Sequence, residues 1–166
     1  PLPFKKEVNK SGVSKKRVVY SFQGDFSLLL KMLTYLLFRY DYLFARNCYA
    51  FRRHYGVKDA VRRLRNTRNI HQMYCLKVDI SNYFNSIDVP MLLNKLTFLK
   101  SEDSAVYDFL VRLLTADKAI YDENGSTNIL TEKRGAMAGT PISPFLANVY
   151  LMEMDHSFER KGILYF

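Results

Sequence analysis

The chain has 166 residues, of which 48% are hydrophobic and 14% aromatic. These values are typical of one packed domain and exclude an intrinsically disordered segment. The formal net charge is +9, and such an excess of positive charge usually marks a polyanionic partner, either nucleic acid or an acidic membrane surface. Cys48 and Cys75 form neither a disulfide framework nor a zinc-binding spacing, so we expect a reducing, cytoplasmic environment.

The first part of the chain predicts a basic arm followed by helices. Residues 3–20 are expected to be strand-forming or irregular, and Asp25 is placed to cap a helix that reaches about Phe44. Leucines recur in this helix at helical spacing, at Leu29, Leu33, Leu36 and Leu37. Two cations interrupt its apolar stretch, which is also shorter than the ~20 residues of a membrane span, so we expect a buried helix and no membrane partner. Residues 57–65 predict a short basic helix.

The segment Tyr74–Ile80 alternates in the manner of a β-strand. Its four large apolar side chains share one face, and Cys75, Lys77 and Asp79 share the other. We therefore expect one face to pack on helices, while the open face holds Asp79 at the strand end in a cleft.

The rest of the chain predicts helices, a hairpin and a final strand. Pro90 suits the first turn of a helix reaching about Leu99, and residues 103–115 form a second helix. Residues 119–121 and 129–130 flank an Asn-Gly turn, the strongest short hairpin signal. Ser143 is expected to cap a helix that reaches about Arg160, and residues 163–166 begin another strand. This order predicts an α+β fold with helices on one face of an antiparallel sheet.

Asp79 is the first candidate for chemistry. Phosphoryl transfer to a nucleotide uses divalent metals, and Mg²⁺ prefers carboxylate, carbonyl and phosphate oxygens. The Asp79 carboxylate and the Ile80 carbonyl are the expected metal ligands. The alternative is that Asp79 merely caps the following turn, and Asp79 taken alone favours that alternative.

A second candidate is the basic stretch between Arg46 and Arg68, which contains eight Lys or Arg residues and one acid, Asp59. Guanidinium groups bind phosphates, and interleaved aromatic rings stack on bases. A charge run is usually a solvated helix face, but the density of one sign favours a nucleic-acid strand here. The residues expected to contact it are Arg46, Tyr49, Phe51, Arg52, Arg53, Tyr55, Arg62, Arg63, Arg65 and Arg68.

Two longer motifs resemble those of bacterial reverse transcriptases of the group II intron, retron and abortive-infection or defence types. Residues 77–87, Lys-Val-Asp-Ile-Ser-Asn-Tyr-Phe-Asn-Ser-Ile, resemble the first metal-binding motif, and residues 139–148, Gly-Thr-Pro-Ile-Ser-Pro-Phe-Leu-Ala-Asn, resemble the nucleotide-pocket motif. Residues 47–53 and 56–60 resemble a fingers motif, and residues 16–19 an earlier fingers strand. The resemblance implies fingers over 1–72 and a partial palm over 73–166, with the sequence ending just before the tyrosine-x-Asp-Asp turn that supplies the other essential carboxylates.

The resemblance also implies roles for individual residues. Lys16 and Arg17 would grip the triphosphate, and Phe84, beside Tyr83, would be the steric gate that excludes a ribose 2′-hydroxyl. Solvated cations and a core aromatic are the respective alternatives. Further implied contacts to the nucleotide or to the templating strand involve Asn47, Ala138, Gly139, Pro141 and Ser143.

Ala138 departs from the family pattern, because many relatives carry Gln immediately before the glycine. The family's Gln touches the incoming nucleotide, so Ala138 favours the divergent defence-type lineages over an ordinary processive enzyme.

Three functions follow from these observations. The first is an RNA-directed DNA polymerase that uses Mg²⁺, an RNA template, an RNA–DNA duplex and deoxynucleoside triphosphates, in a bacterial retroelement or phage-defence system. We expect the 166-residue piece by itself to be inactive. The second is a non-catalytic RNA-binding module that retains the fold. The third, an RNA-templated RNA polymerase, is disfavoured by Phe84, since such enzymes usually place a small polar or acidic residue there.

Overall fold

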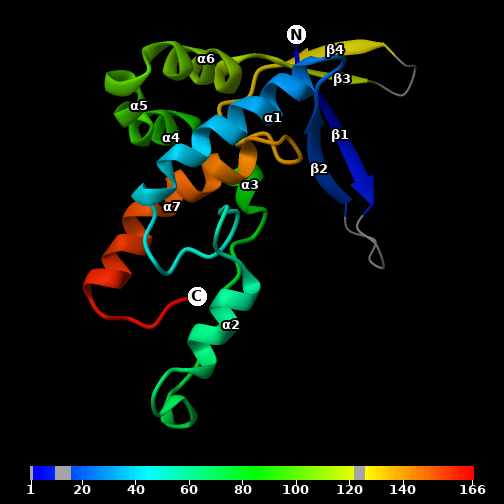
Figure 1. Cartoon of the computed structure of the whole chain (residues 1–166). Helices are drawn as coiled ribbons and strands as arrows, with labels where there is room; N and C mark the ends of the chain where they lie inside the picture. The colour runs from blue at the N-terminus through cyan, green and yellow to red at the C-terminus, as the bar shows by residue number, and fades with distance from the viewer. Residues whose placement is uncertain (1, 10–15, 122–125) are drawn as a thin grey trace.

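The computed structural model describes residues 2–9, 16–121 and 126–166 (Figure 1). The elements follow one another as β1 (Phe4–Asn9), β2 (Lys16–Ser21), α1 (Phe26–Leu37), η1 (Phe38–Leu43), α2 (Val57–Arg65), η2 (Ile70–Gln72), α3 (Tyr83–Ser86), α4 (Val89–Lys95), α5 (Thr97–Glu102), α6 (Ser104–Thr115), β3 (Lys118–Tyr121), β4 (Thr127–Leu130) and α7 (Ser143–Arg160). The fold is α+β, as predicted. No helix in the described ranges combines the length and the apolar character needed to cross a bilayer.

A four-stranded sheet in the order β2-β1-β3-β4 lies at one end of the molecule (Figure 1). The pairs β1–β2 and β3–β4 are antiparallel hairpins, and β1 pairs with β3 in parallel. The strands of the second hairpin are as predicted, although the Asn-Gly turn at 124–125 lies outside the described residues. Of the two alternatives for the basic arm, strand-forming or irregular, the structure has strands. The sheet combines strands from either side of residue 72, where we expected the fingers to end.

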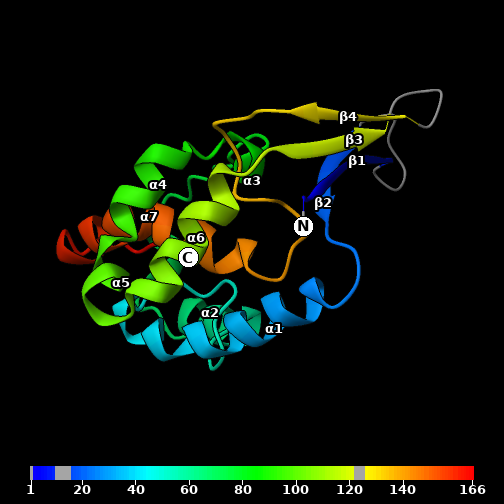
Figure 2. The same cartoon turned by 90° about the horizontal axis from the view of Figure 1, so that it is seen from above.

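The core is built around α7, which lies between α1 and α4 (Figure 2). Leu30 and Leu37 from α1, Leu92 from α4, and Leu146 and Val149 from α7 are almost fully buried in one cluster. Each buried side chain of this size contributes about 1.5–3 kcal/mol relative to leaving it exposed. This cluster holds the N-terminal half of α7, and the loop before it, against the sheet end of the molecule.

Several predicted helix boundaries differ from the structure. The helix after Asp25 ends at Leu37 and continues as a 3₁₀ segment, and the helix expected over 90–99 divides at Leu96. Leu29 and Leu36 are exposed rather than buried, because only one face of α1 meets the core. Ser143 is the first residue of α7 and not its cap; its hydroxyl donates to the Thr140 carbonyl at 3.0 Å.

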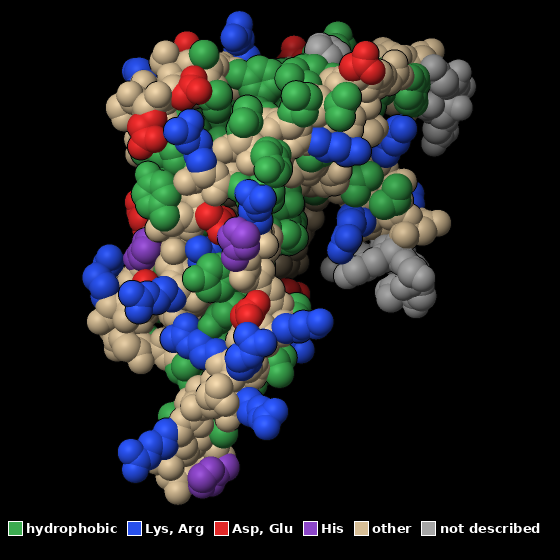
Figure 3. All heavy atoms as spheres, in the orientation of Figure 1, with side chains coloured by type: hydrophobic (Ala, Val, Ile, Leu, Met, Phe, Trp, Pro, Cys, Tyr) green, Lys and Arg blue, Asp and Glu red, His purple; other side chains and the backbone are tan. Residues whose placement is uncertain are grey.

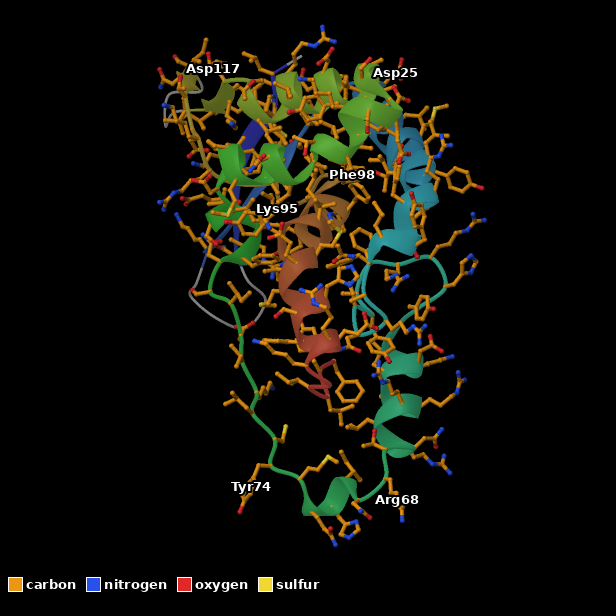
Figure 4. All side chains as sticks on the ribbon, turned by 90° about the vertical axis from the view of Figure 1, so that its left-hand side faces the viewer. Asp25, Arg68, Tyr74, Lys95, Phe98 and Asp117 are labelled. Carbon is orange, nitrogen blue, oxygen red and sulfur yellow. The ribbon has the colours of Figure 1, made fainter. Side chains whose placement is uncertain are left out.

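The predictions of a strand at 74–80, which carries Asp79, and of another beginning at 163–166 are wrong. Residues 74–80 are extended and exposed, and among the described residues neither this segment nor 163–166 pairs with any strand. Figure 4 shows Tyr74 pointing away from the body of the molecule. A strand needs a neighbour to bond its N–H and C=O groups, so alternation alone does not produce one.

Glu132, just after β4, ties the sheet together. Its carboxylate accepts hydrogen bonds from the Lys5 ammonium of β1 and from the Tyr20 hydroxyl of β2, the latter at 2.9 Å. Its carbonyl accepts from the buried Lys118 ammonium of β3 at 3.1 Å. Burial alone would raise the pKa of Glu132, but the hydrogen bonds from Lys5 and Tyr20 and the charges of Lys5 and Lys118 outweigh it, so the pKa lies below its ordinary value.

We predict that Glu132→Gln lowers the free energy of unfolding at pH 7 by about 1–2 kcal/mol, because hydrogen bonds to a charged group are lost. Since the folded-state pKa of Glu132 is lowered, its contribution is present above the unfolded-state pKa of about 4.3 and disappears as the pH falls through the folded value. Urea unfolding at pH 7 and in acid measures both effects.

The control is Glu7→Gln, which removes an exposed ion pair between Glu7 of β1 and Lys16 of β2. It should change the free energy of unfolding by less than about 0.5 kcal/mol. Equal effects of the two substitutions would contradict the role of Glu132.

Candidate functional site

Three segments that are distant in the sequence meet beside the sheet: β2, the α3 turn and the loop before α7. The Tyr20 N–H donates to the Ala138 carbonyl at 2.7 Å, and the Ala136 N–H donates to the Phe84 carbonyl at 2.8 Å. The Asn85 side-chain amide donates to the Val18 carbonyl at 3.3 Å, which joins the α3 turn to β2. The candidate triphosphate strand, gate residue and nucleotide-pocket motif therefore form one hydrogen-bonded unit.

Gly139 is required by the contact between the loop and β2. It has a φ of +92°, and a Cβ built on it would lie 3.1 Å from Cβ of Val19 and 3.4 Å from the Tyr20 carbonyl oxygen. A side chain here would be strained by the backbone and crowded by β2. The contact with β2 thus explains why position 139 is a glycine, in addition to the close approach to a nucleotide that the resemblance implies.

The adjacent aromatics Tyr83 and Phe84 are placed differently. The Tyr83 hydroxyl donates to the Ala147 carbonyl of α7 at 2.6 Å, and burial raises its pKa. Phe84 is half-buried, and its ring meets the exposed Phe51 ring edge to face, with centroids 6.1 Å apart. Tyr83 is therefore held by α7, whereas Phe84 lies between the core and an exposed ring of the fingers motif.

Asp79 and Ile80 lie in the extended segment before this turn, and both are exposed. Their carboxylate and carbonyl are the hard oxygen donors that Mg²⁺ prefers. Among the described residues, however, no three His, Cys, Asp or Glu side chains are grouped closely enough to hold a metal ion. The donors present match magnesium in kind and provide part of a site.

The cations of β2 are open to solvent. Lys16 pairs with Glu7 at 3.0 Å, with both side chains largely exposed, and Arg17 is exposed beside it. Such a pair is weak, so an incoming anion competes for Lys16 at little cost.

Arg52, by contrast, is committed to the structure. Its guanidinium donates to the Asp41 carboxylate at 3.2 Å and to three backbone carbonyls, those of Asp41, Ala45 and Cys48. Its side chain is only 6% exposed. The cation expected to bind nucleic acid therefore fixes the loop that follows η1.

Arg63 of α2 lies in a mixed aromatic and basic pocket. It donates to the Asn47 side chain at 2.8 Å and to the Tyr49 hydroxyl at 3.2 Å. A pocket of about 420 Å³ opens beside these groups and is lined by Tyr49, His54, Tyr55, Asp59, Arg62, Arg63, Asn66 and Thr67. Proteins bind single-stranded nucleic acid with aromatic rings that stack on the bases and with cationic groups that bind the phosphates.

The remaining arginines form an exposed basic surface. The helix α2 has no buried residue and projects from the body, with Lys and Arg side chains gathered on it (Figure 3). Its acid, Asp59, pairs with Arg62 at 3.0 Å and bonds the Gly56 N–H. Arg46, Arg53, Arg65 and Arg68 are exposed as well.

Of the other predicted contacts, Pro141 is half-buried and Ser143 is buried at the start of α7.

Asp155 is a buried acid to which the sequence analysis assigned no role. It is buried on α7 near Tyr165, and its Oδ1 atom has no hydrogen-bond partner among the described residues. Burial raises the pKa of Asp155, and burial and Asp155 raise that of Tyr165 to about 12. The Tyr165 ring meets the Phe158 ring of α7 edge to face, with centroids 5.3 Å apart, and this contact joins residues 163–166 to α7.

Comparison with known proteins agrees with the geometry. A putative COX1/OXI3 intron 2 protein of Saccharomyces cerevisiae is 29% identical over 125 residues, which cover 74% of this chain and 14% of that protein. This chain thus spans a small part of that relative's length. Residues 6–166 match the family described as reverse transcriptase (RNA-dependent DNA polymerase), a match that includes β2, the α3 turn and the loop before α7. The chain belongs to the reverse transcriptase family.

Proposed function

We propose that this chain forms the fingers and the first part of the palm of an RNA-directed DNA polymerase, and that it binds the incoming deoxynucleotide beside β2. The observation that carries the proposal is the hydrogen-bonded unit of β2, the α3 turn and the loop before α7. It joins the strand that carries Arg17, the turn that carries Phe84 and the loop that carries Gly139. These are the residue types needed for a triphosphate, a sugar and a closely approached base pair.

Within this proposal, Asp79 and the Ile80 carbonyl hold Mg²⁺, which when bound polarises the attacking hydroxyl and neutralises the leaving phosphates. Lys16 and Arg17 bind the triphosphate oxygens, which orients the nucleotide. The Phe84 ring borders the sugar, and its contact with Phe51 limits how far it moves aside. Pro141 and Ser143, at the start of α7, support the templating base pair.

We further propose that the template strand follows α2 and the pocket beside Arg63. The exposed positions Arg46, Arg65 and Arg68 supply phosphate contacts, and Tyr49 and Tyr55 supply stacking surfaces.

The similarity to an intron protein supports a retroelement, and Ala138 in place of the usual Gln supports a divergent bacterial retroelement or phage-defence enzyme. The free thiols of Cys48 and Cys75 favour a reducing cytoplasm.

A second candidate is an RNA-binding module that has kept the fold without catalysis. The exposed basic surface and the single carboxylate at Asp79 favour it. Primer extension by the complete protein separates the two functions, since a binding module would hold the RNA–DNA duplex and not extend it.

We predict that Asp79→Ala in the complete protein abolishes primer extension and leaves RNA binding within about twofold, because the segment is exposed and substitutions at exposed positions usually change stability little. The matched control is Asp108→Ala, an exposed acid on α6 that should leave extension unchanged. Extension retained by Asp79→Ala would remove this residue from the proposed metal site.

We predict that the 166-residue chain binds single-stranded RNA weakly and does not polymerise. The logarithm of the binding constant should fall with the logarithm of salt by ~0.7 per phosphate contact. Arg65→Ala/Arg68→Ala should therefore reduce this slope by about 1.4. The pair Lys100→Ala/Arg112→Ala removes the same charge from α5 and α6 and should change the slope little. Equal slopes for all three proteins would place the RNA elsewhere.

We predict that Phe84→Val in the complete protein raises ribonucleotide incorporation relative to deoxynucleotide incorporation. If Phe84 only packed the core, truncation would cost up to ~3–5 kcal/mol of stability, and both rates would fall together. The ratio of the two rates, read beside the melting temperature, separates these roles. Phe98→Val, a half-buried ring against Tyr40, is the matched control that should lower the melting temperature without changing the ratio.

A further inference from the structure

The outward face of α1 is apolar. Five large side chains on it recur at helical spacing and are 46–62% exposed: Leu28, Leu29, Met32, Tyr35 and Leu36. The opposite face, with Leu30 and Leu37, is buried in the core. A surface helix normally presents polar residues outward, and a helix that is apolar all round is normally covered. Figure 3 shows hydrophobic side chains gathered over the course of α1, with Lys and Arg among them.

The apolar stripe leads into a hollow at the C-terminal end of α1. The hollow has a volume of about 380 Å³ and is lined by Tyr35, Leu36, Phe38, Arg39, Asp41, Arg53 and His54. The Arg53 guanidinium lies 5.3 Å from the centroid of the Tyr35 ring, so a cation and an aromatic ring border the same opening. A side chain from a docked helix would enter here as the stripe ends.

The charges around the stripe are positive. Lys31, Arg39 and Arg53 are exposed, and none of them forms an ion pair within the described residues. Of the acids near α1, Asp41 pairs with Arg52, while Asp25 is exposed at the opposite, N-terminal end of the helix. The rim therefore attracts negatively charged side chains.

We propose that this face binds an amphipathic helix of a partner protein, whose apolar side chains cover the α1 stripe and whose flanking Asp and Glu side chains meet Lys31, Arg39 and Arg53. The twelve residues of α1 extend about 18 Å, enough for two to three turns of a packed helix. The hollow beside Tyr35 receives one side chain at the end of the contact, with Arg53 at its edge.

Other occupants match the surface less well. A second copy of this chain would bring basic rims together between molecules of formal charge +9, and its exposed helix α2 is basic rather than acidic. Single-stranded RNA would stack on Tyr35 and reach Arg53, but it would leave the aliphatic side chains of Leu28, Met32 and Leu36 without apolar partners.

The test uses a fluorescein-labelled 18-residue helical peptide with Leu at heptad positions a and d and Glu at e and g, titrated with the chain and followed by anisotropy. A second peptide carries Lys at e and g. We expect the Glu peptide to bind at least about tenfold more tightly than the Lys peptide, because its charges oppose those of the rim. The variant Arg39→Glu/Arg53→Glu should reverse that preference.

Met32→Ser/Leu36→Ser should weaken binding of the Glu peptide by about tenfold or more, with an unchanged melting temperature, because both side chains are exposed. Val57→Ser/Ile129→Ser removes two apolar side chains that are at least as exposed, from α2 and β4, and should bind as the unaltered chain does.

Four results would overturn the proposal. They are equal binding of the two peptides, binding that survives Met32→Ser/Leu36→Ser, a dimer in sedimentation equilibrium that this variant abolishes, and displacement of the peptide by a 20-nucleotide single-stranded RNA. The third would assign the face to a second copy of the chain, and the fourth to nucleic acid.

Discussion

The arrangement of the site depends on the contact between β2 and the loop before α7. One backbone hydrogen bond of 2.7 Å joins Tyr20 to Ala138, and Gly139 allows the loop to approach Val19 within the reach of a single methyl group. Because α7 is held by the apolar core, this contact ties the sheet to the helices. A nucleotide bound beside β2 would therefore meet a surface whose parts are already held in place, and less ordering would be needed when it binds.

The basic character of the chain divides into two physical roles. Arg52 is surrounded by carbonyls and the Asp41 carboxylate, so its charge serves the loop between η1 and α2. On α2, Arg63 bonds the Asn47 and Tyr49 side chains, whereas Arg62 and Arg65 are exposed on a helix that has no buried residue. Arg52 therefore holds the loop that carries Phe51, whereas the exposed arginines of α2 leave positive charge available to phosphates.

The exposed apolar residues lie in two places with different explanations. Residues 74–80 are a strand-like sequence without a paired neighbour among the described residues, so their side chains have no sheet face on which to pack. The helix α1 is complete by itself, because its hydrogen bonds are internal. Its outward leucines are therefore a property of the finished surface, and a partner's apolar face is the physical means of removing them from water.

Local signals in the sequence determined much of this protein. The second hairpin, the basic helix α2, the helix after Pro90 and the family motifs all follow from turn residues, charge and short spacings, which act within a few residues of the chain. Tertiary structure alone decided that Leu29 and Leu36 of α1 face outward, that the Arg52 side chain is enclosed while Arg53 is exposed, and that Asp155 is buried. It also decided that the alternating residues 74–80 form no strand. These outcomes depend on which distant segment lies opposite, and periodicity along one segment contains no information about its neighbour.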